Sequence, residues 1–414
     1  MNSTEILQIT PEREKIAIGE LKATQKSDFS LSVFDPLVVS FFNDLSRDIL
    51  RNNNLNRVAA TAALGFWLRR SHIESIIAEN GHLVNPGKVY VSPVGLVFHI
   101  CPSNVDTMFL YSLAISLLAG NKNILRISER LNDPLMDEVF DIINTNLQKD
   151  DYRVLSEYIN IVTYGHSSEI NSYFSGLADV RIIWGGDATI NTFKSFKTGT
   201  RTRDIAFADR ISCSVFKTKL FNASTPENKK EATRKFFNDS YTFDQLGCSC
   251  PQYLFLLGDE NDNSLFKKDF YDLLSVMAEE NYNNDISSLA SLKLNKLVSD
   301  SLETVQIESA ERENNYLYFV HMDSSNTELL HSAGAGYFYL QEVDKLENIA
   351  KLANKKFQTL CYFGLDKEEI ISLCEVSKGL GIDRIVPVGS ALDFEYIWDG
   401  YNLFDELTSK KWVV

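Results

Sequence analysis

From about residue 88 onward the chain alternates between short apolar runs and segments with helical periodicity, and this alternation limits the possible folds more than any other feature. A parallel sheet covered by helices on both faces needs such continuous runs, rich in valine and isoleucine, as its strands. Right-handed crossovers between them then give a doubly wound domain. The five predicted strands are 94–100, 123–127, 159–164, 180–184 and 211–216.

A second α/β unit is predicted C-terminal to this domain. A helix from 227 to about 240 is followed by a loop that contains Gly247-Cys248-Ser249-Cys250-Pro251 and then by an apolar strand. The segment RIVPVG is predicted to be a loop, and the tail KKWVV a strand that pairs with the body of the protein or with another subunit. Further predicted elements are strands at 253–257, 316–320, 337–340 and 359–363, and helices within about 263–303 and 344–356.

The first 88 residues are predicted to be a helical segment that packs on the first domain. Asp35 stands before Pro36 in the arrangement that caps a helix start, and apolar residues follow at helical spacing. A second helix is expected from Val58 to about Glu79. The predicted division is an N-terminal helical segment (1–88), a dinucleotide-binding domain (89–222), a catalytic domain (223–383) and a C-terminal return segment with a terminal strand (384–414).

Charge and hydropathy exclude several classes of partner. The formal charge of -15 argues against a general nucleic-acid partner, because phosphate backbones attract surplus Lys and Arg. The N-terminus lacks the basic and apolar regions of a signal peptide, and no stretch of about 18 uncharged apolar residues occurs that could span a membrane. We therefore expect a cytoplasmic protein without a membrane span.

The cysteines are scattered and do not form a disulfide framework, which indicates a reduced protein. A Cys-x-Cys pair at 248–250 has no second Cys or His pair at zinc spacing, so we predict no metal site. Cys248 follows a glycine and precedes a proline by three residues, where a sharp turn could present its side chain as a nucleophile. An isolated cysteine is more often an inert buried residue, and Cys250 has the same local company.

Three further positions follow predicted strands, where a doubly wound sheet holds its ligands. Asn104 follows the first strand and is either a simple helix cap or an amide donor to an oxyanion. Arg126 and Ser128 end the second strand, where a ribose phosphate could bind, although a plain surface arginine is equally consistent. Gly185-Gly186 follows the fourth strand and would let the backbone approach a cofactor, or form an ordinary tight turn.

Together these positions resemble a known family. The run VSPVGLVFHICPSNVDT, then LAISLLAGNKNILRIS, is similar to the nucleotide-domain signature of the aldehyde dehydrogenase superfamily. GFWLRR, WGGD, FDQLGCSCPQ and DRIVPVGSALDFEYIWDGY resemble the LuxC-type (long-chain) acyl-CoA reductases of that superfamily, so the resemblance covers nearly the whole chain. It implies an aldehyde-dehydrogenase-like α/β fold, with a doubly wound parallel-sheet cofactor domain, an α/β catalytic domain and a terminal oligomerisation strand.

The resemblance implies a role for each matching position. It places the catalytic cysteine at Cys248 and not at Cys250, and the oxyanion asparagine at Asn104. Arg126 and Ser128 fall where relatives contact the adenosine ribose, and an arginine there suits the 2′-phosphate of NADPH. The paired glycines Gly185 and Gly186 fall near the turn that contacts the cofactor phosphates.

Two departures from the superfamily pattern bear on the reaction. Hydrolytic members have a glutamate in a Glu-Leu-Gly-Gly segment, whereas the corresponding residues 207–212 (FADRIS) contain none. Loss of the base that would activate water fits an acyl-enzyme that is reduced and not hydrolysed. Their later Glu-x-Phe-Gly-Pro motif is replaced by His331-Ser332-Ala333-Gly334, which leaves the grip on the nicotinamide ribose unexplained.

The family implies NADPH-dependent reduction of an acyl thioester, acyl-CoA or protein-bound and first of all fatty acyl, to the aldehyde through a Cys248 acyl-enzyme. Bacterial luminescence uses such a reaction for its aldehyde supply. The family also implies a homo-oligomer and a companion acyl-activating synthetase. Three alternatives stay open: an NADPH-independent cysteine acyltransferase or thioesterase, an acyl-phosphate reductase, and a catalytically silent member that binds partners.

Overall fold

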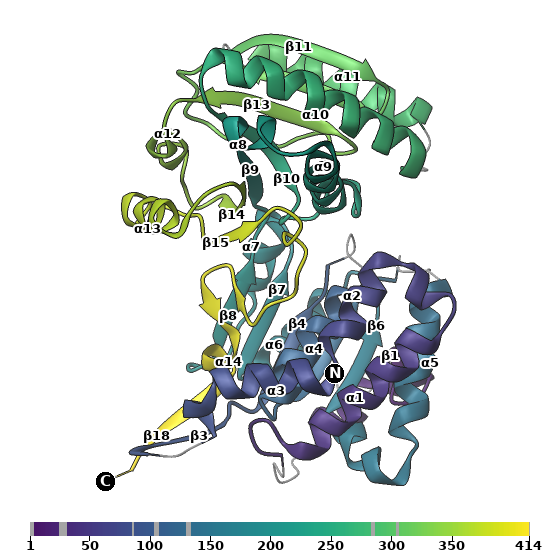
Figure 1. Ribbon diagram of the computed structural model, residues 1–414. Helices are drawn as coiled ribbons and strands as arrows, with labels where there is room; N and C mark the ends of the chain where they lie inside the picture. The colour runs from purple at the N-terminus through teal and green to yellow at the C-terminus, as the bar shows by residue number, and fades with distance from the viewer. Residues whose placement is uncertain are drawn as a thin grey trace. The chain divides into compact units, whose positions relative to one another are not determined.

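The computed structural model divides into two compact units (Figure 1). The first comprises residues 1–208 and 394–414, and the second comprises residues 209–393. No helix among the described residues is long and apolar enough to cross a membrane. The structure describes residues 4–24, 31–84, 87–102, 107–129, 134–282, 286–303 and 306–413.

The first unit contains a seven-stranded sheet in the order β2-β1-β6-β5-β4-β7-β8. The five strands from β6 to β8 are parallel, and β1 pairs antiparallel with both β6 and β2. Across the parallel part the chain order is third, second, first, fourth and fifth, which is the doubly wound order. The strands are Glu5–Thr10 (β1), Glu14–Ala17 (β2), Leu96–Ile100 (β4), Lys122–Ile127 (β5), Ile159–Thr163 (β6), Val180–Trp184 (β7) and Arg203–Phe207 (β8).

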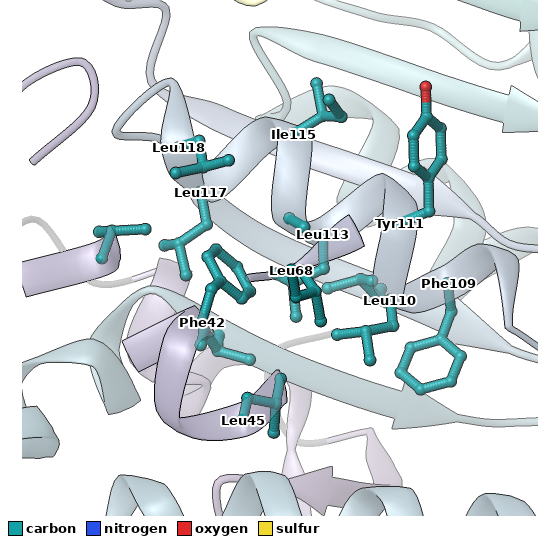
Figure 2. Packing of buried hydrophobic residues seen from close by; sticks show 14 of the residues in the cluster. Phe42, Leu45, Leu68, Phe109, Leu110, Tyr111, Leu113, Ile115, Leu117 and Leu118 are labelled. Atoms are coloured by element: carbon teal, nitrogen blue, oxygen red, sulfur yellow. The ribbon is translucent and has the colours of Figure 1, made fainter. Parts of the chain in front are cut away.

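Helix α4 (Met108–Leu118) is the centre of this unit, because every one of its residues is buried. A helix that is apolar on all sides must be covered on all sides. Phe42 and Leu45 of α1 and Leu68 lie in the same cluster as the leucines of α4 (Figure 2). The other helices of the unit are Pro36–Arg51 (α1), Ala59–Trp67 (α2), Arg70–Glu79 (α3), Pro134–Leu147 (α5), Ser168–Leu177 (α6), Asp187–Ser195 (α7) and Leu403–Glu406 (α14).

The second unit has its own seven-stranded sheet, in the order β11-β12-β13-β10-β9-β14-β15. All neighbouring strands are parallel except β11 and β12. Successive side chains point to opposite faces, so Val215 and Phe216 of β9 lie in separate cores on the two sides of the sheet. The strands are Ile211–Lys217 (β9), Pro251–Leu257 (β10), Ile307–Asn314 (β11), Leu317–Met322 (β12), Tyr337–Val343 (β13), Phe357–Phe363 (β14) and Arg384–Pro387 (β15).

Three helices of the second unit, α9, α10 and α13, begin at recognisable capping residues. Thr225, Asp259 and Asp366 each accept a backbone N–H at the start of α9, α10 and α13, and Glu369 completes a capping box at α13. The helices of this unit are Thr218–Asn222 (α8), Pro226–Tyr241 (α9), Glu260–Asn281 (α10), Ile286–Glu303 (α11), Leu346–Ala350 (α12) and Lys367–Val376 (α13).

The C-terminal tail pairs with the body of the protein, which is one of the two predicted arrangements. Strand β18 (Thr408–Trp412) pairs antiparallel with β3 (Val89–Pro93), and both belong to the first unit. A second small ladder joins β16 (Ile397–Trp398) and β17 (Tyr401–Asn402). The Trp412 side chain is 70% exposed, so this two-stranded ribbon leaves apolar surface uncovered.

The predicted α/β class and the doubly wound parallel sheet are confirmed. The predicted fifth strand does form, but its placement in the first sheet is wrong. Residues 211–216 belong to β9 and lie between β10 and β14 in the second sheet. The fifth strand of the first sheet is β8, which begins with the exposed residues Arg203 and Asp204. An edge strand needs no continuous apolar run. The apolar pattern therefore missed β8 and identified the next fully buried strand, β9, in its place.

Three other local predictions are wrong. Residues 5–17 form strands β1 and β2 and not helix, because the sheet edge beside β6 offers them a partner. The predicted loop at 384–389 contains β15, an edge strand with its proline at the last position, where a missing N–H is tolerated. The predicted helix 58–79 is two helices, since Arg69 adopts an extended conformation between them. The division into four domains is finer than the two compact units and stays a prediction.

Candidate active site

Cys248 lies in the loop that joins α9 to β10, at the amino end of that strand. Its side chain is partly exposed, whereas Cys101, Cys213, Cys250 and Cys361 are buried. Burial raises the pKa of the Cys250 thiol far above its usual range. A thiol must ionise to act as a nucleophile, so the geometry favours Cys248 over its neighbour. Its catalytic role stays a prediction.

The backbone before Cys248 follows an unusual path. Asp244 and Gln245 are consecutive non-glycine residues with φ values of 54° and 61°. This left-handed conformation costs about 1 kcal/mol or more for each such residue, so surrounding contacts must hold it.

Gln245 supplies these contacts. Its side chain is buried, and its amide nitrogen donates to the backbone oxygens of Pro251 (2.9 Å) and Tyr337 (3.1 Å). Its amide oxygen accepts from the backbone nitrogens of Gly336 (3.0 Å) and Tyr337 (3.2 Å). Two donors and two acceptor positions are all that a glutamine amide has. The Cys248 loop is therefore fastened to the loop that leads into β13.

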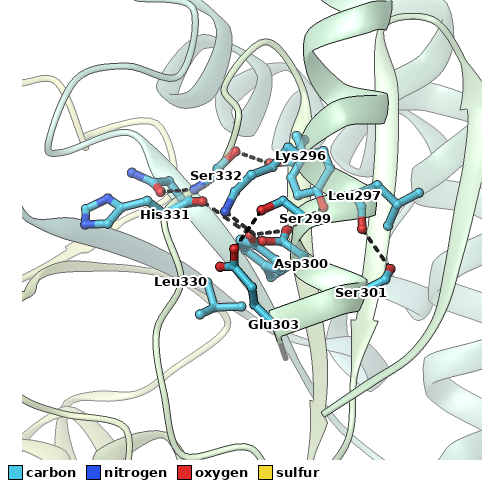
Figure 3. Close-up of polar contacts among 12 residues, drawn as sticks. Lys296, Leu297, Ser299, Asp300, Ser301, Glu303, Leu330, His331 and Ser332 are labelled. Atoms are coloured by element: carbon cyan, nitrogen blue, oxygen red, sulfur yellow. Dashed lines mark hydrogen bonds and ion pairs between the residues drawn. The ribbon is translucent and has the colours of Figure 1, made fainter. Parts of the chain in front are cut away.

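The loop that leads into β13 is held in turn by α11. Lys293 is buried and its Nζ donates to the backbone oxygen of Ala335 at 2.7 Å, and burial lowers the pKa of Lys293 to about 8. The buried Asp300 accepts from the hydroxyls of Tyr337 (2.8 Å) and Tyr339 (2.7 Å) and pairs with Lys296 (Figure 3). Buried charges need such partners. Helix α11 therefore holds both this loop and the start of β13 in place.

The Cys248 sulfur receives a hydrogen bond from a side chain in another strand. The amide nitrogen of Gln358, the second residue of β14, lies 3.2 Å from Sγ. The hydroxyl of Ser249 donates to the Gln358 amide oxygen at 3.1 Å. The hydroxyl of Ser212, in β9, donates to the Cys248 backbone oxygen at 2.6 Å. Three neighbouring parallel strands thus fix the thiol at their amino ends.

The predicted cofactor residues lie at the carboxyl ends of internal strands of the first sheet. Arg126 is in β5 and Ser128 directly follows it, while Gly185 and Gly186 lie between β7 and α7. Because β5 and β7 flank β4 in parallel, all four positions lie at the carboxyl ends of adjacent strands. This is the edge at which doubly wound sheets bind ligands. The predicted oxyanion donor Asn104 lies outside the described residues.

Arg126 fits an anionic ligand by its chemistry. Its guanidinium lies 5.1 Å from the centre of the Tyr164 ring, and its Nε is buried without a hydrogen-bond partner in the part of the chain that the structure describes. A buried N–H without an acceptor is unfavourable, and a phosphate oxygen would satisfy it. At Gly186 a Cβ would meet no atom within 4 Å, so this residue leaves open space before α7.

The two segments that depart from the superfamily pattern contact each other. His331 Nε2 lies 3.5 Å from the Oδ2 of Asp209, within the FADRIS segment. Both side chains are largely exposed, so this pair contributes little to stability. No group of three or more His, Cys, Asp or Glu residues that could hold a metal ion occurs among the described residues.

The chain matches one family model, described as acyl-CoA reductase (LuxC), over residues 47–410. No curated protein matches it. Among solved structures, an aldehyde dehydrogenase from Brucella melitensis biovar abortus 2308 is similar over 99% of this chain and 93% of its own, with 12% identity and a TM-score of 0.65. A lactaldehyde dehydrogenase is similar over 99% of this chain and 95% of its own, with 13% identity and a TM-score of 0.63.

A third similar structure is betaine aldehyde dehydrogenase from Staphylococcus aureus, which was solved in complex with NAD⁺. It is 13% identical, covers 99% of this chain and 90% of its own, and gives a TM-score of 0.61. These likenesses confirm the predicted aldehyde-dehydrogenase-like fold.

Sequence reasoning missed the two glutamines that fix the cysteine loop. Gln245 stood inside the recognised segment FDQLGCSCPQ but received no role. Gln358 directly precedes the apolar run TLCYF, and a polar residue at the entry to a buried strand was a usable signal. Its contact with Cys248 spans 110 positions in the sequence, and no local pattern shows such a contact.

Proposed function

Because this chain belongs to the acyl-CoA reductase (LuxC) family, we propose that it reduces an acyl thioester to the aldehyde with NADPH as the electron donor. The proposed substrate is acyl-CoA or a protein-bound thioester, with a fatty acyl group as in the aldehyde supply of bacterial luminescence. The observation that carries the proposal is the partly exposed Cys248 thiol, held in a fixed loop with an amide donor on its sulfur.

In the proposed reaction the Cys248 thiolate attacks the thioester carbonyl. A new carbon–sulfur bond forms at Cys248, the bond to the carrier thiol breaks, and the carrier leaves as a thiolate that takes up a proton. NADPH, when bound, supplies the hydride that reduces the acyl carbon. The Cys248 backbone N–H and the Asn104 amide are the proposed oxyanion donors, and one such donor is worth about 10²–10³ in rate.

The local chemistry around Cys248 supports reduction over hydrolysis. The FADRIS segment contains no glutamate at the position where hydrolytic relatives have the base that activates water. Without a general base an attacking water would remain a poor nucleophile. The acyl-enzyme would therefore persist until the reductant binds.

The proposed cofactor site lies at the carboxyl ends of β4, β5 and β7. Arg126 would pair with a phosphate on the adenosine ribose, and Ser128 would lie beside it. Gly185 and Gly186 would let the backbone approach the remaining phosphates. Among the described residues the buried Nε of Arg126 has no partner, and this donor supports the proposed contact with a 2′-phosphate, the group that NADPH has and NADH lacks.

Two proposals concern the setting of the enzyme. We propose a homo-oligomer in which the β3–β18 ribbon, with its exposed Trp412, contacts a second subunit. We also propose a cytoplasmic location and an acyl-activating synthetase as the partner that delivers the acyl group.

The test of the proposed reaction is NADPH oxidation across a panel of acyl-CoAs from two to eighteen carbons. The expected result is aldehyde formation in one-to-one ratio with oxidised NADPH. Turnover of acyl-CoA without NADPH would instead establish an acyltransferase or thioesterase. NADPH-dependent turnover of an acyl phosphate but of no acyl-CoA would establish an acyl-phosphate reductase. No turnover of either substrate class, with or without NADPH, would contradict all three.

A further inference from the structure

We propose that Gln358 is a positioning residue for the nucleophile, and that its amide N–H stabilises the sulfur anion of Cys248 both before acylation and when the aldehyde leaves. This inference rests on the proposed function, in which Cys248 is the nucleophile. Neither the family match nor the fold assigns a role to this glutamine.

The contact between Gln358 and Cys248 is built into the sheet. Gln358 is 2% exposed and is the second residue of β14, and its Nε2 reaches the sulfur of the β10 loop at 3.2 Å. Strand β9 lies between these two elements, and its Ser212 holds the Cys248 backbone oxygen. The sulfur and the amide are thus held by two different parts of one sheet, the loop before β10 and strand β14.

The Gln358 amide presents its nitrogen to the Cys248 sulfur and its oxygen to the Ser249 hydroxyl. The Ser212 hydroxyl has one proton, and its 2.6 Å contact with the Cys248 oxygen uses it. The Ser249 proton is available for the Gln358 Oε1, which lies 3.1 Å away. With Oε1 accepting from Ser249, the amide N–H₂ points to Sγ, and an N–H donor suits an anionic sulfur better than a neutral one.

This hydrogen bond changes in strength along the proposed reaction. It stabilises the thiolate that attacks, becomes weak when sulfur is part of a neutral thioester, and strengthens again as the carbon–sulfur bond of the reduced intermediate breaks and the electron pair returns to sulfur. An interaction that is strongest where charge develops lowers the barrier of that step. Gln358 would therefore assist acyl-enzyme formation by raising the fraction of thiolate, and aldehyde release by stabilising the charge that develops on sulfur.

The experiment measures the alkylation of Cys248 by iodoacetamide as a function of pH, in the full-length protein. The thiolate displaces iodide and forms a thioether, so the midpoint of the rate profile reports the ionisation of Cys248. Adducts are followed on the peptide that contains Cys248, because the exposed Cys374 will also react. This readout needs neither acyl substrate nor NADPH.

Gln358→Met keeps the length of the side chain and removes the donor. We expect the midpoint to rise by about one pH unit, which is a tenfold lower rate at any pH well below it. Gln358→Glu should raise it further, because a carboxylate repels the thiolate. Ser249→Ala should raise it by less than Gln358→Met, since it only loosens the orientation of the amide.

Gln341→Met is the matched control. Gln341 is equally buried in β13 of the same sheet, and its amide contacts Asn326 and Asp323. Its variant should leave the midpoint unchanged while showing the cost of losing a buried amide. If Gln358→Met does not fold, Gln358→Glu and Ser249→Ala still report the effect.

An unchanged or lowered midpoint in folded Gln358→Met and Gln358→Glu would overturn the inference. This failure is distinct from failure of the proposed function. A wild-type protein that reduces acyl-CoA with no effect of Gln358 on alkylation contradicts only the role of the glutamine. A shifted midpoint in a protein that reduces no acyl thioester contradicts only the reaction.

Discussion

The two units each contain a parallel sheet, but they place their candidate functional residues at opposite strand ends. In the first unit Arg126 and Gly185 lie at the carboxyl ends of β5 and β7. In the second unit Ser212, Cys248 and Gln358 lie at the amino ends of β9, β10 and β14. The first arrangement follows the general rule for doubly wound sheets, and the second departs from it.

The difference shows two ways to build a site. At the carboxyl ends, a turn after each strand presents backbone and one or two side chains, so local sequence is enough to find them. At the amino ends, Cys248 is held by side chains from other strands, above all Gln245 and Gln358, through contacts across the sheet. Substitutions at the two sites test this contrast.

The largest effect is expected from Cys248→Ala. Removing the nucleophile should lower the rate of aldehyde formation by at least about 10³-fold, because the covalent step has no other thiol in its place. Steady-state NADPH oxidation with the best acyl-CoA measures it. Cys250→Ala is the control and should retain activity, since that thiol is buried; the reverse pattern would move the site to Cys250.

Arg126→Ala tests the carboxyl-end site. Loss of the ribose-phosphate contact should raise the KM for NADPH by about 10- to 100-fold, by analogy with charge-assisted hydrogen bonds of about 1.5–3 kcal/mol. The KM for acyl-CoA should not change. Initial rates with NADPH and with NADH separate the two cofactors, and an equal loss with both would argue against a 2′-phosphate contact.

Gln245→Leu tests the four hydrogen bonds by which the Gln245 side chain holds the Cys248 loop, here called the clamp. The substitution removes the Gln245 contacts to the oxygen of Pro251, to the nitrogen of Gly336 and to both backbone groups of Tyr337. We expect the free energy of unfolding to fall by about 2–4 kcal/mol, which chemical denaturation measures. A fall in activity without any loss of stability would show that the clamp acts on the loop alone.

The smallest expected effect is a pH dependence at Lys293. Burial lowers its pKa to about 8 in the folded protein, below its ordinary value of 10.5. Between these two pH values the unfolded chain binds more protons, so stability should rise with pH across this window through this group. Lys293→Met should remove that contribution. Urea denaturation of both proteins at pH 7.5 and 9.5 measures it, and parallel pH dependences would contradict the assignment.

The sequence predicted those parts of the fold that have a local signature. Four strands of the first sheet were recognised because their sequences are largely apolar. Strands β1 and β8 were missed because each is short and includes exposed residues, so neither contains a long apolar run. Their pairing partners, and not their own composition, make them strands.

The candidate site divides in the same way. Cys248 and the strand-end residues Arg126 and Gly185 came from motifs in the sequence. Gln358 did not, because a glutamine gains its role only when β14 folds beside β9. Long-range contacts of this kind depend on the order of strands in the sheet, which the position of residues 211–216 shows was only partly predictable.

The most direct test of the account is mass spectrometry of the intact protein and of its proteolytic peptides after mixing with acyl-CoA in the absence of NADPH. One acyl group should appear on the peptide that contains Cys248, and it should disappear when NADPH is added, with release of one equivalent of aldehyde. An acyl adduct of equal size on the Cys248→Ala protein, or an adduct that leaves as free acid when NADPH is added, would contradict it.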